Sequence, residues 1–392
     1  MKPPIEREGK VNKSSLPKSM LAAALLLGLI TTAFPGQAEI TTKASHAILM
    51  DYDTGAVLLT KNPDVQMPPA SMSKLMTIYM LLKRLKDGRI SIDDEFPVSK
   101  KAWKMGGSKM FVEVNTRIQV GDLLRGIIVQ SGNDACIVVA EGISGTEEDF
   151  AADMTKVAHE LGLEGSSFRN ASGWPDPDHH VSPRNLAMLA RILISEFPDY
   201  YPIFSEREFT YSKIKQGNRN PLLYGPTGAD GLKTGHTKAS GYGLVASAKR
   251  GDRRLILVVN GLNSVNERAR ESERLLNLGF AQYKNVKVLD AGEAAGQAEV
   301  WLGNAPTVPL VLDKALKITV PTRDKDKLKV TLEYQRPLPA PLKKGQAIGN
   351  LRVQAPGMED LTIPLLAGAD VPKLGMFSQI WPKFKRLVLS IL

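Results

Sequence analysis

Apolar and polar positions alternate at both ends of the first 285 residues of the chain, and helical patterns lie between them. Apolar residues on either side of the turn Asp53-Thr54-Gly55 predict a hairpin over residues 45–62. Two further strands are predicted at 241–248 and 254–259, again joined by a turn. Because strands from both ends enclose the helices, we expect one antiparallel sheet with helices packed on it.

Between these strands, apolar residues recur at intervals of three and four, which is the period of a helix. A helix is predicted from residue 71 to about residue 86, because Pro68-Pro69 precede it and Gly88 follows it. The same pattern predicts helices over 121–129 and 147–161. A charged helix from about residue 267 to 283 closes this part of the chain.

From about residue 286 the pattern changes to short apolar runs separated by Pro and Gly. Leu328, Val330, Leu332 and Tyr334 alternate with polar residues, which predicts a half-buried strand. Comparable apolar runs recur at residues 300, 317–320, 351–353 and 361–366. We therefore expect a second, smaller, all-β domain over residues 286–370, without obvious catalytic residues.

The N-terminal 38 residues have the pattern of a signal peptide. Five cations precede an apolar run over residues 20–30, and Gly36-Gln37-Ala38 supplies small residues for cleavage after Ala38. The apolar run is too short to span a bilayer comfortably. We expect an exported protein whose mature chain begins at Glu39; an uncleaved N-terminal anchor is the alternative.

The last residues, 371–392, have an amphipathic helical pattern. Seven apolar residues fall on one face of this helix: Phe377, Ile380, Trp381, Phe384, Leu387, Val388 and Ile391. Three cations, Lys383, Lys385 and Arg386, lie among the other positions, and Pro382 kinks the helix or starts its second half. We expect a helix that lies in the membrane interface, with a last helix docked on its own core as the alternative.

The net charge limits the classes of binding partner, and the cysteine content limits the possible disulfides. A leader with five cations and two carboxylates, a net +3, leaves about +7 of the formal charge of +10 on the mature chain. Export excludes nucleic acid as the partner of this charge and leaves anionic lipid headgroups and cell-wall polymer. Cys136 is the only cysteine, so no intramolecular disulfide forms, and we expect a small buried hydrophobe rather than a catalytic thiol.

The first domain contains three short motifs that suggest chemistry. Ser71-Met72-Ser73-Lys74 starts a predicted helix, where the spacing of three residues lets the Lys74 amine reach the Ser71 hydroxyl. The positive end of the helix dipole also stabilises charge that develops at Ser71. An ordinary helix start is the structural alternative, because serine is favoured as a cap.

The second and third motifs are equally short. Ser131-Gly132-Asn133 lies between two apolar runs, and Gly132 permits a tight turn that presents its neighbours to a cleft. Lys233-Thr234-Gly235 precedes a predicted strand and combines a cation, a hydroxyl and a glycine that lets a ligand approach the backbone. Taken alone, each is also typical of a solvated turn or a strand start.

The order and spacing of the three motifs resemble those of the penicillin-binding protein and serine β-lactamase superfamily. Their flanking residues, in 69–77, 131–135 and 230–237, are similar to the low-molecular-mass D-alanyl-D-alanine carboxypeptidases of the penicillin-binding protein 5 type, serine peptidase family S11. Such enzymes also have a β-rich second domain and a C-terminal amphipathic anchor. The resemblance implies an α/β (α+β) transpeptidase-like catalytic domain over residues 39–285, followed by the β-domain and an anchor over 371–392.

The resemblance implies that the enzyme removes the terminal D-alanine from peptidoglycan stem peptides through an acyl-enzyme on Ser71, which β-lactams also acylate. Lys74 is then the base, with a pKa lowered by burial and by Lys233, and Ser131 relays a proton. Asn133 holds the substrate amide. The resemblance further implies a cationic binding site for the substrate carboxylate. It also implies an oxyanion hole formed by the backbone N–H groups of Ser71 and His236. The substrate-binding residues of this region are Lys233, Thr234, Gly235, His236 and Arg268.

Other interpretations remain open from the sequence. The same site suits a β-lactamase or a D,D-endopeptidase, although residues 163–170 lack the Glu-x-x-Leu-Asn pattern of class A β-lactamases. The third interpretation is a penicillin sensor or wall-binding scaffold whose site is acylated but does not turn over. Arg219 is a weaker candidate for the carboxylate, with a solvated surface arginine as its expected role.

A metal site is the less favoured interpretation of four residues in a loop rich in Pro and Asp: Asp176, Asp178, His179 and His180. Such a composition is typical of a surface turn, so we expect neither a metal nor another cofactor. The expected location is the periplasmic face of the cytoplasmic membrane, with peripheral attachment through the C-terminal helix.

Overall fold

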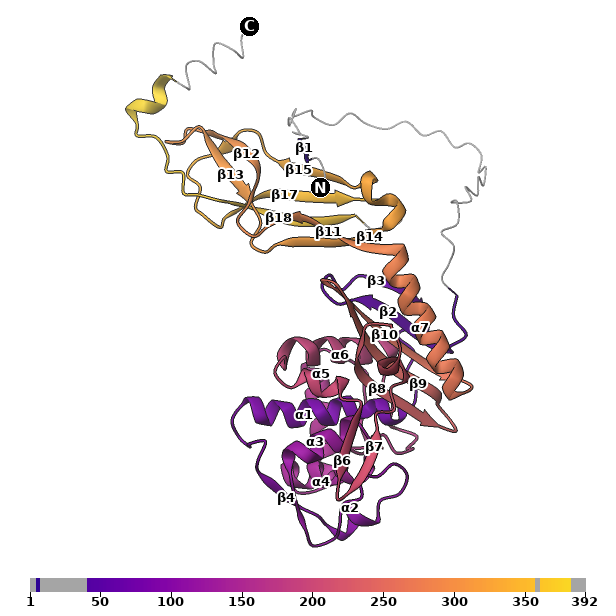
Figure 1. The fold of residues 1–392 in the computed structure, drawn as a ribbon. Coiled ribbons are helices and arrows are strands. Elements are labelled where there is room, and N and C mark those ends of the chain that lie inside the picture. The colour runs from indigo at the N-terminus through magenta and orange to yellow at the C-terminus, as the bar shows by residue number, and fades with distance from the viewer. Residues whose placement is uncertain (1–4, 8–40, 357–359, 382–392) are drawn as a thin grey trace, which may run out of the picture. The chain divides into compact units, whose positions relative to one another are not determined.

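The structure, a computed structural model, describes residues 5–7, 41–356 and 360–381 and divides into two compact units (Figure 1). One unit consists of residues 40–281 and the other of residues 282–392 with the N-terminal 39 residues. Residues 8–38 of the expected leader and its cleavage position lie outside the described residues. Within the leader, β1 (Ile5–Arg7) pairs in parallel with β15 (Lys329–Tyr334) of the same unit.

The first unit is built on a five-stranded antiparallel sheet, which confirms the predicted arrangement. Strands from both ends of the unit are neighbours, because β2 pairs with β10. In spatial order the strands are β3 (Val57–Lys61), β2 (His46–Asp51), β10 (Arg253–Leu262), β9 (Gly241–Arg250) and β8 (Ala229–Thr237).

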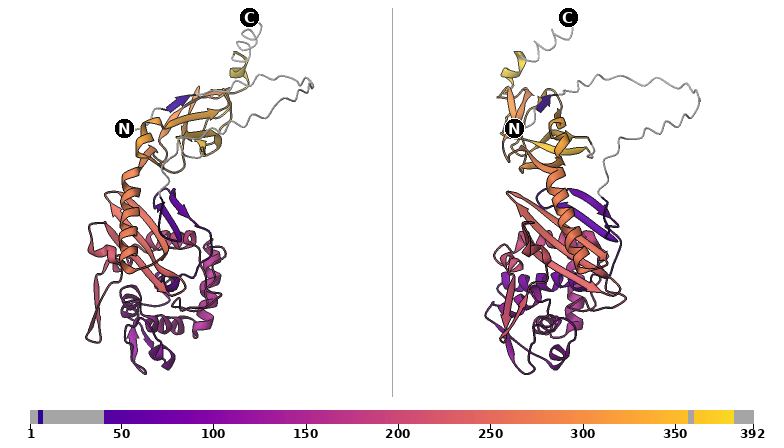
Figure 2. Two further views of the ribbon diagram at one scale, coloured as in Figure 1. Left: turned by 90° about the vertical axis from the view of Figure 1, so that its right-hand side faces the viewer. Right: turned by 45° about the vertical axis from the view of Figure 1, so that its right-hand side comes forward.

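Alternate residues of the central strands face opposite sides of this sheet. Ile48 and Met50 of β2 belong to the main apolar core, which lies on the side of most helices. On the other side packs α7 (Val265–Gln282), where a side chain at Gly279 would collide with Leu49 and Leu255 (Figure 2). The sheet is therefore covered on both faces, as apolar strands require.

The helical side contains α1 (Lys74–Lys86), α2 (Lys100–Lys104), α3 (Val120–Ile128), α4 (Asn133–Ser144), α5 (Glu147–Glu160) and α6 (Pro183–Glu196). Two small hairpins accompany them: β4 (Glu95–Pro97) with β5 (Arg117–Gln119), and β6 (Glu208–Tyr211) with β7 (Ile214–Gly217). Thr146 and Ser182 accept backbone N–H groups as the caps of α5 and α6.

The helix predicted from residue 71 begins differently. Residues Ala70–Ser73 form a 3-10 turn, η1, and α1 starts only at Lys74, whose N–H donates to the carbonyl of Ser71. The tighter hydrogen-bond ring of this turn winds the chain more closely than an α-helix does. Ser71 therefore lies on the 3-10 turn, three residues before the first residue of α1.

The second unit is the predicted all-β domain and has its own apolar core. Its main sheet contains β1, β15, β17 (Ala347–Gln354), β18 (Leu361–Ala367), β13 (Thr307–Val311), β12 (Ala294–Trp301) and β16 (Leu338–Pro339), and β11 (Tyr283–Leu289) pairs with β14 (Leu316–Pro321). The apolar residues Val330, Leu332 and Tyr334 of β15 are buried as predicted, but Thr331 of the polar set is buried as well, so the alternation is incomplete.

The expected helix does not start at residue 371. Val371 is buried in the β core, where its backbone pairs with Leu342. A 3-10 turn follows at Phe377–Gln379, and residues 382–392, with Pro382 and the three cations, lie outside the described residues. In the described part of the chain, no helix has the length and apolar character needed to cross a membrane.

Candidate active site

The amine of Lys74 lies at the centre of a group of oxygen atoms from three segments. Its Nζ donates to Oγ of Ser71 at 2.8 Å, to Oδ1 of Asn133 at 2.7 Å and to the carbonyl oxygen of Ser172 at 2.5 Å. The Lys74 side chain is fully buried. Burial lowers the pKa of Lys74 to about 8, and repulsion from Arg219 adds to this effect.

A second buried lysine bonds to the second motif. Nζ of Lys233, on β8, donates to Oγ of Ser131 at 2.8 Å and to the carbonyl oxygen of Thr234 at 3.1 Å. Burial and the repulsion of Lys74 hold the pKa of Lys233 well below its usual value. Repulsion between the two amines is mutual, and burial is the largest cause of the lowered pKa of each lysine.

The turn of the second motif places its strain on Ser131. Ser131 has φ of +62°, whereas Gly132 has φ of −58°, so the left-handed backbone conformation of this turn belongs to Ser131 rather than to Gly132. Glycine is needed at residue 132 for space, because a side-chain carbon there would lie 2.9 Å from Oδ1 of Asp134. That carboxylate accepts the backbone N–H groups of Met110, Phe111 and Val112 and so holds this segment against the turn.

A cavity of about 440 Å³ opens over these groups. It brings together residues from all three motifs and from α7, while Lys74, Asn133 and Lys233 are buried and contact the lining serines. The lining residues are Ser71, Ser108, Ser131, Arg219, Thr234, Gly235, His236, Tyr242, Val265 and Arg268. The structure thus gathers every predicted site residue in or directly behind one cavity.

One side of the cavity is cationic. Arg268 is buried, with its guanidinium 5.8 Å from the ring centre of Tyr242, and that ring in turn stacks on His236. Among the described residues, Nε of Arg268 has no hydrogen-bond partner. Arg219 is solvent-exposed, as expected, but it also lines the cavity and donates to Oγ of Ser108 at 2.6 Å. This side suits an anionic group.

Gly235 allows the edge strand β8 to approach the nucleophile turn. A side-chain carbon at residue 235 would lie 2.9 Å from the carbonyl oxygen of Pro69 and 3.0 Å from Met72. Only glycine fits this close contact. It brings β8 so near to the nucleophile turn that His236, the residue after Gly235, and Ser71 line the same cavity.

Sequence reasoning missed several members of the site. The Ser172 carbonyl is a backbone group, so no residue type marks it, and Ser108 belongs to a loop without a motif. Tyr242 faces His236 in the register of β8 and β9, whereas the predicted hairpin joined only residues 241–248 and 254–259.

The four residues considered for a metal have other contacts. His179 is buried and lies 2.7 Å from Oγ of Ser73 through Nε2, while its Nδ1 accepts the backbone N–H of Arg169. Asp178 forms an ion pair with Arg169 at 3.7 Å. Among the described residues, no group of three or more His, Cys, Asp or Glu side chains is arranged to hold a metal ion.

Cys136 lies in α4, one turn after Asn133. It is a free, fully buried thiol. Burial raises the pKa of Cys136 to about 12, so the thiol stays protonated at neutral pH. These properties suit packing rather than nucleophilic chemistry.

The chain belongs to the D-alanyl-D-alanine carboxypeptidase family, peptidase S11, whose profile matches residues 32–264. Residues 283–373 match the C-terminal domain of penicillin-binding protein 5. The chain is 40% identical to D-alanyl-D-alanine carboxypeptidase DacA of Haemophilus influenzae, over 86% of this chain and 88% of that protein. It is 37% identical to D-alanyl-D-alanine carboxypeptidase DacC of Escherichia coli, over 94% of this chain and 95% of that protein.

Solved structures agree with this assignment. The crystal structure of penicillin-binding protein 5 from Haemophilus influenzae has a TM-score of 0.80 and 39% identity, covering 86% of this chain and all of that one. Penicillin-binding protein D2 from Listeria monocytogenes in its ampicillin-bound form has a TM-score of 0.57 and 28% identity, covering 62% and all of that chain.

Proposed function

We propose that this chain is a serine carboxypeptidase that removes the terminal D-alanine from peptidoglycan stem peptides through an acyl-enzyme on Ser71. The observation that supports it most is the buried Lys74 amine, 2.8 Å from the Ser71 hydroxyl. With a pKa of about 8, Lys74 is neutral in a usable fraction of molecules near neutral pH. A neutral amine at this distance takes the serine proton as a general base.

Acylation uses the groups around the cavity. The Ser71 oxygen attacks the carbonyl carbon between the two D-alanines, and its proton passes to Lys74. When the C–N bond breaks, the Ser131 hydroxyl gives its proton to the leaving amine and regains one from Lys74, which is then neutral again. Free D-alanine departs, and the backbone N–H groups of Ser71 and His236 stabilise the oxyanion during this step.

Deacylation completes the cycle. Water gives a proton to neutral Lys74 as it attacks the ester carbon, the Ser71 oxygen leaves and takes that proton back from Lys74, and the shortened peptide is released. The amide of Asn133 already accepts from Lys74 and donates to the carbonyl of Gly106, which leaves one N–H of Nδ2 for the substrate amide.

The cationic side of the cavity recognises the terminal carboxylate. Lys233 bonds to Ser131, Thr234 lines the cavity, and Arg268 and Arg219 extend the positive charge along it. A β-lactam presents an amide and a carboxylate in the same relationship, so it acylates Ser71 and blocks the site.

The direct test is release of D-alanine from a pentapeptide that ends in two D-alanines, with residues 39–392 as the enzyme and Ser71→Ala as the control. We expect turnover only with Ser71, and covalent labelling by penicillin on a denaturing gel only with Ser71. Labelling without D-alanine release would favour the sensor or scaffold. Labelling of Ser71→Ala would remove Ser71 as the nucleophile.

We further propose that the chain is exported, loses residues 1–38 and is held peripherally at the periplasmic face of the cytoplasmic membrane. The apolar side chains after the β core support an attachment at this end, because Met376, Phe377, Ile380 and Trp381 are all exposed. Catalysis belongs to the unit of residues 40–281, which carries all three motifs.

A further inference from the structure

The carbonyl of Ser172 reaches Lys74 from a loop that no active-site motif contains. The three acceptors of Lys74 are this carbonyl, Asn133 and Ser71. A neutral amine has two N–H groups and one lone pair. If the carbonyl and Asn133 take the two N–H groups, the lone pair points at the hydroxyl of Ser71. The position of the Ser172 carbonyl therefore decides whether the lone pair of Lys74 points at the hydroxyl proton of Ser71.

Ala171, the residue before Ser172, is hydrogen-bonded through both its backbone N–H and its backbone carbonyl. The N–H of Ala171 donates to Oε1 of Glu147 at 3.1 Å, and its carbonyl accepts from Oγ1 of Thr77 at 2.6 Å. Thr77 lies one turn after Lys74 on α1. The loop thus follows α1, bound at Thr77 and again at Lys74.

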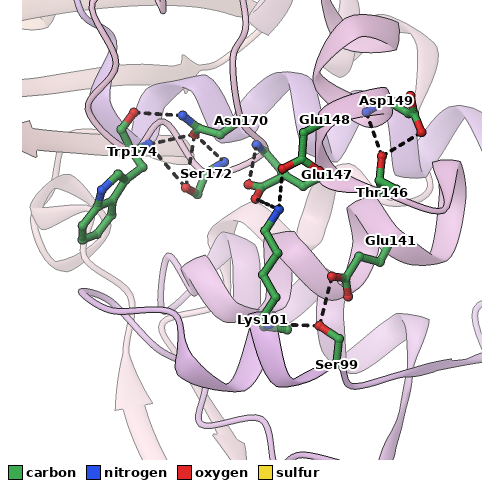
Figure 3. A network of polar contacts seen from close by, with 12 residues as sticks. Ser99, Lys101, Glu141, Thr146, Glu147, Glu148, Asp149, Asn170, Ser172 and Trp174 are labelled. Atoms are coloured by element: carbon green, nitrogen blue, oxygen red, sulfur yellow. Dashed lines mark hydrogen bonds and ion pairs between the residues drawn. The ribbon is translucent and has the colours of Figure 1, made fainter.

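Asn170 holds the loop from its other end. Its Oδ1 accepts the N–H groups of Ser172 at 3.2 Å and Trp174 at 2.9 Å, and its Nδ2 donates to the carbonyl of Trp174 (Figure 3). Gly173 then passes so close to the nucleophile turn that a side-chain carbon would lie 2.0 Å from the carbonyl oxygen of Ala70. The loop has little room to shift without losing these bonds.

Glu147 is fixed by a further contact outside the loop. Its carboxylate is nearly buried at the start of α5, and Oε2 pairs with Lys101 of α2 at 3.0 Å. Lys101 pairs with the exposed Glu148 as well, at 2.8 Å (Figure 3). Only Glu147, of these two neighbouring carboxylates, reaches the loop backbone at Ala171.

We propose that Glu147 and Asn170 are positioning residues for acylation, which hold the Ser172 carbonyl on Lys74 and so orient the base toward Ser71. This inference rests on the proposed function of Ser71 and Lys74. Neither residue lines the cavity, so both act through the loop backbone rather than through the substrate.

The test compares each truncating substitution with one that keeps the acceptor. Glu147→Leu removes the acceptor of the Ala171 N–H, whereas Glu147→Gln keeps an oxygen there. Asn170→Leu removes the acceptor of two N–H groups, whereas Asn170→Asp keeps it. Glu148→Gln is the matched control, because it removes a carboxylate that pairs with Lys101 but has no contact with the loop.

The measurement is stopped-flow acylation of the 39–392 chain by a fluorescent penicillin, which gives noncovalent affinity, rate constant and labelled fraction separately. We expect both leucine variants to lose roughly 10- to 100-fold in the acylation rate constant, because small misplacements of a reacting group cost this much. Noncovalent affinity and the labelled fraction should stay as in the parent chain, and the Gln, Asp and Glu148→Gln variants should acylate within about threefold of it.

Leucine variants with an unchanged rate constant would overturn the inference, and so would a loss confined to the labelled fraction, which reports misfolded protein. If Glu147→Leu does not fold, the Asn170 pair decides by itself. A parent chain that penicillin does not label would instead contradict the proposed function, so the two failures are distinguishable.

Discussion

Lys233 and Ser131 are hydrogen-bonded to each other at 2.8 Å although they come from β8 and from the turn before α4. Both side chains are buried. Besides the Ser131 hydroxyl, the Lys233 amine bonds to the carbonyl of Thr234. A buried amine that loses one of two such acceptors is left poorly satisfied, so each member of the pair depends on the other.

The pair should therefore behave as one unit in catalysis. Ser131→Ala and Lys233→Met should each slow acylation by penicillin roughly 10²- to 10⁴-fold, the range of a lost proton-transfer group. The double variant should be little slower than the worse single variant, because groups that act together are not additive. A double-mutant cycle on the acylation rate constant measures this. Losses that multiply would show two independent roles.

Lys74→Arg tests whether Lys74 supplies a proton acceptor or only a positive charge. Arginine keeps the cation but is not neutral near pH 7, so acylation should fall by several orders of magnitude. Lys83→Arg, an exposed position on the same helix, is the control and should keep the parent rate. Near-normal acylation by the Lys74 variant would assign Lys74 a purely electrostatic role.

The pH dependence of acylation should follow the same amine. Lys74 must be neutral to take the proton, and its pKa is lowered to about 8, so the rate constant should rise with pH and level off above about 8. Below that pH the rate should fall about tenfold per unit. The rate of penicillin acylation between pH 5 and 10 gives the profile. A flat profile from pH 6 to 9 would contradict the assignment of Lys74 as the base.

The motifs could be predicted from sequence because they are side-chain chemistry at fixed intervals. Ser71, Lys74, Ser131 and Lys233 all meet at one cavity as the resemblance implies. The apolar pattern also predicted several strands of both units within a few residues, but it missed β8, β11 and β13, and the third motif lies within β8 rather than before a strand.

Backbone geometry could not be predicted in the same way. The 3-10 turn at Ala70–Ser73 and the positive φ of Ser131 depend on tertiary contacts, not on residue type. The contact of the Ser172 carbonyl with Lys74 has no sequence signal, because every residue has a carbonyl. His179 illustrates the converse case, since its residue type suggested a ligand and its burial gave it a bond to Ser73.

His179 should make the fold sensitive to acid. Burial lowers its pKa to about 4 from 6.5, so between these pH values the unfolded chain binds a proton that the folded chain does not. The free energy of unfolding should therefore fall as pH drops through this window, by about 3 kcal/mol in total at 1.36 kcal/mol per pKa unit. Below pH 4 this contribution should change no further.

The check for His179 is denaturant unfolding at several pH values for the parent chain and for His179→Gln, which keeps a donor for Ser73 without titrating. The difference between the two curves should change between pH 6.5 and 4. His180→Gln is the control and should follow the parent chain. Parallel curves for parent and His179→Gln would show that folding does not lower the pKa of His179.

Removal of the C-terminal segment should separate membrane binding from catalysis. A chain of residues 39–375 keeps Val371 and the last backbone contacts of the β core, but it loses Met376 and everything after it. It should no longer sediment with anionic vesicles, because the apolar residues and the cations Lys383, Lys385 and Arg386 are absent. Each cation near anionic lipid contributes about 1 kcal/mol.

The same truncated chain should release D-alanine from a soluble pentapeptide at the parent rate, because Ser71, Ser131 and Lys233 all belong to the unit of residues 40–281. High salt should weaken vesicle binding of the 39–392 chain only in part, since salt screens charges but not apolar burial. A matched variant, Phe377→Asp with Trp381→Asp, keeps the cations and should also lose most of its binding, because both side chains are exposed and apolar. Equal vesicle binding by all three chains would remove the anchor, and an inactive truncation would point to a segment that supports the catalytic unit.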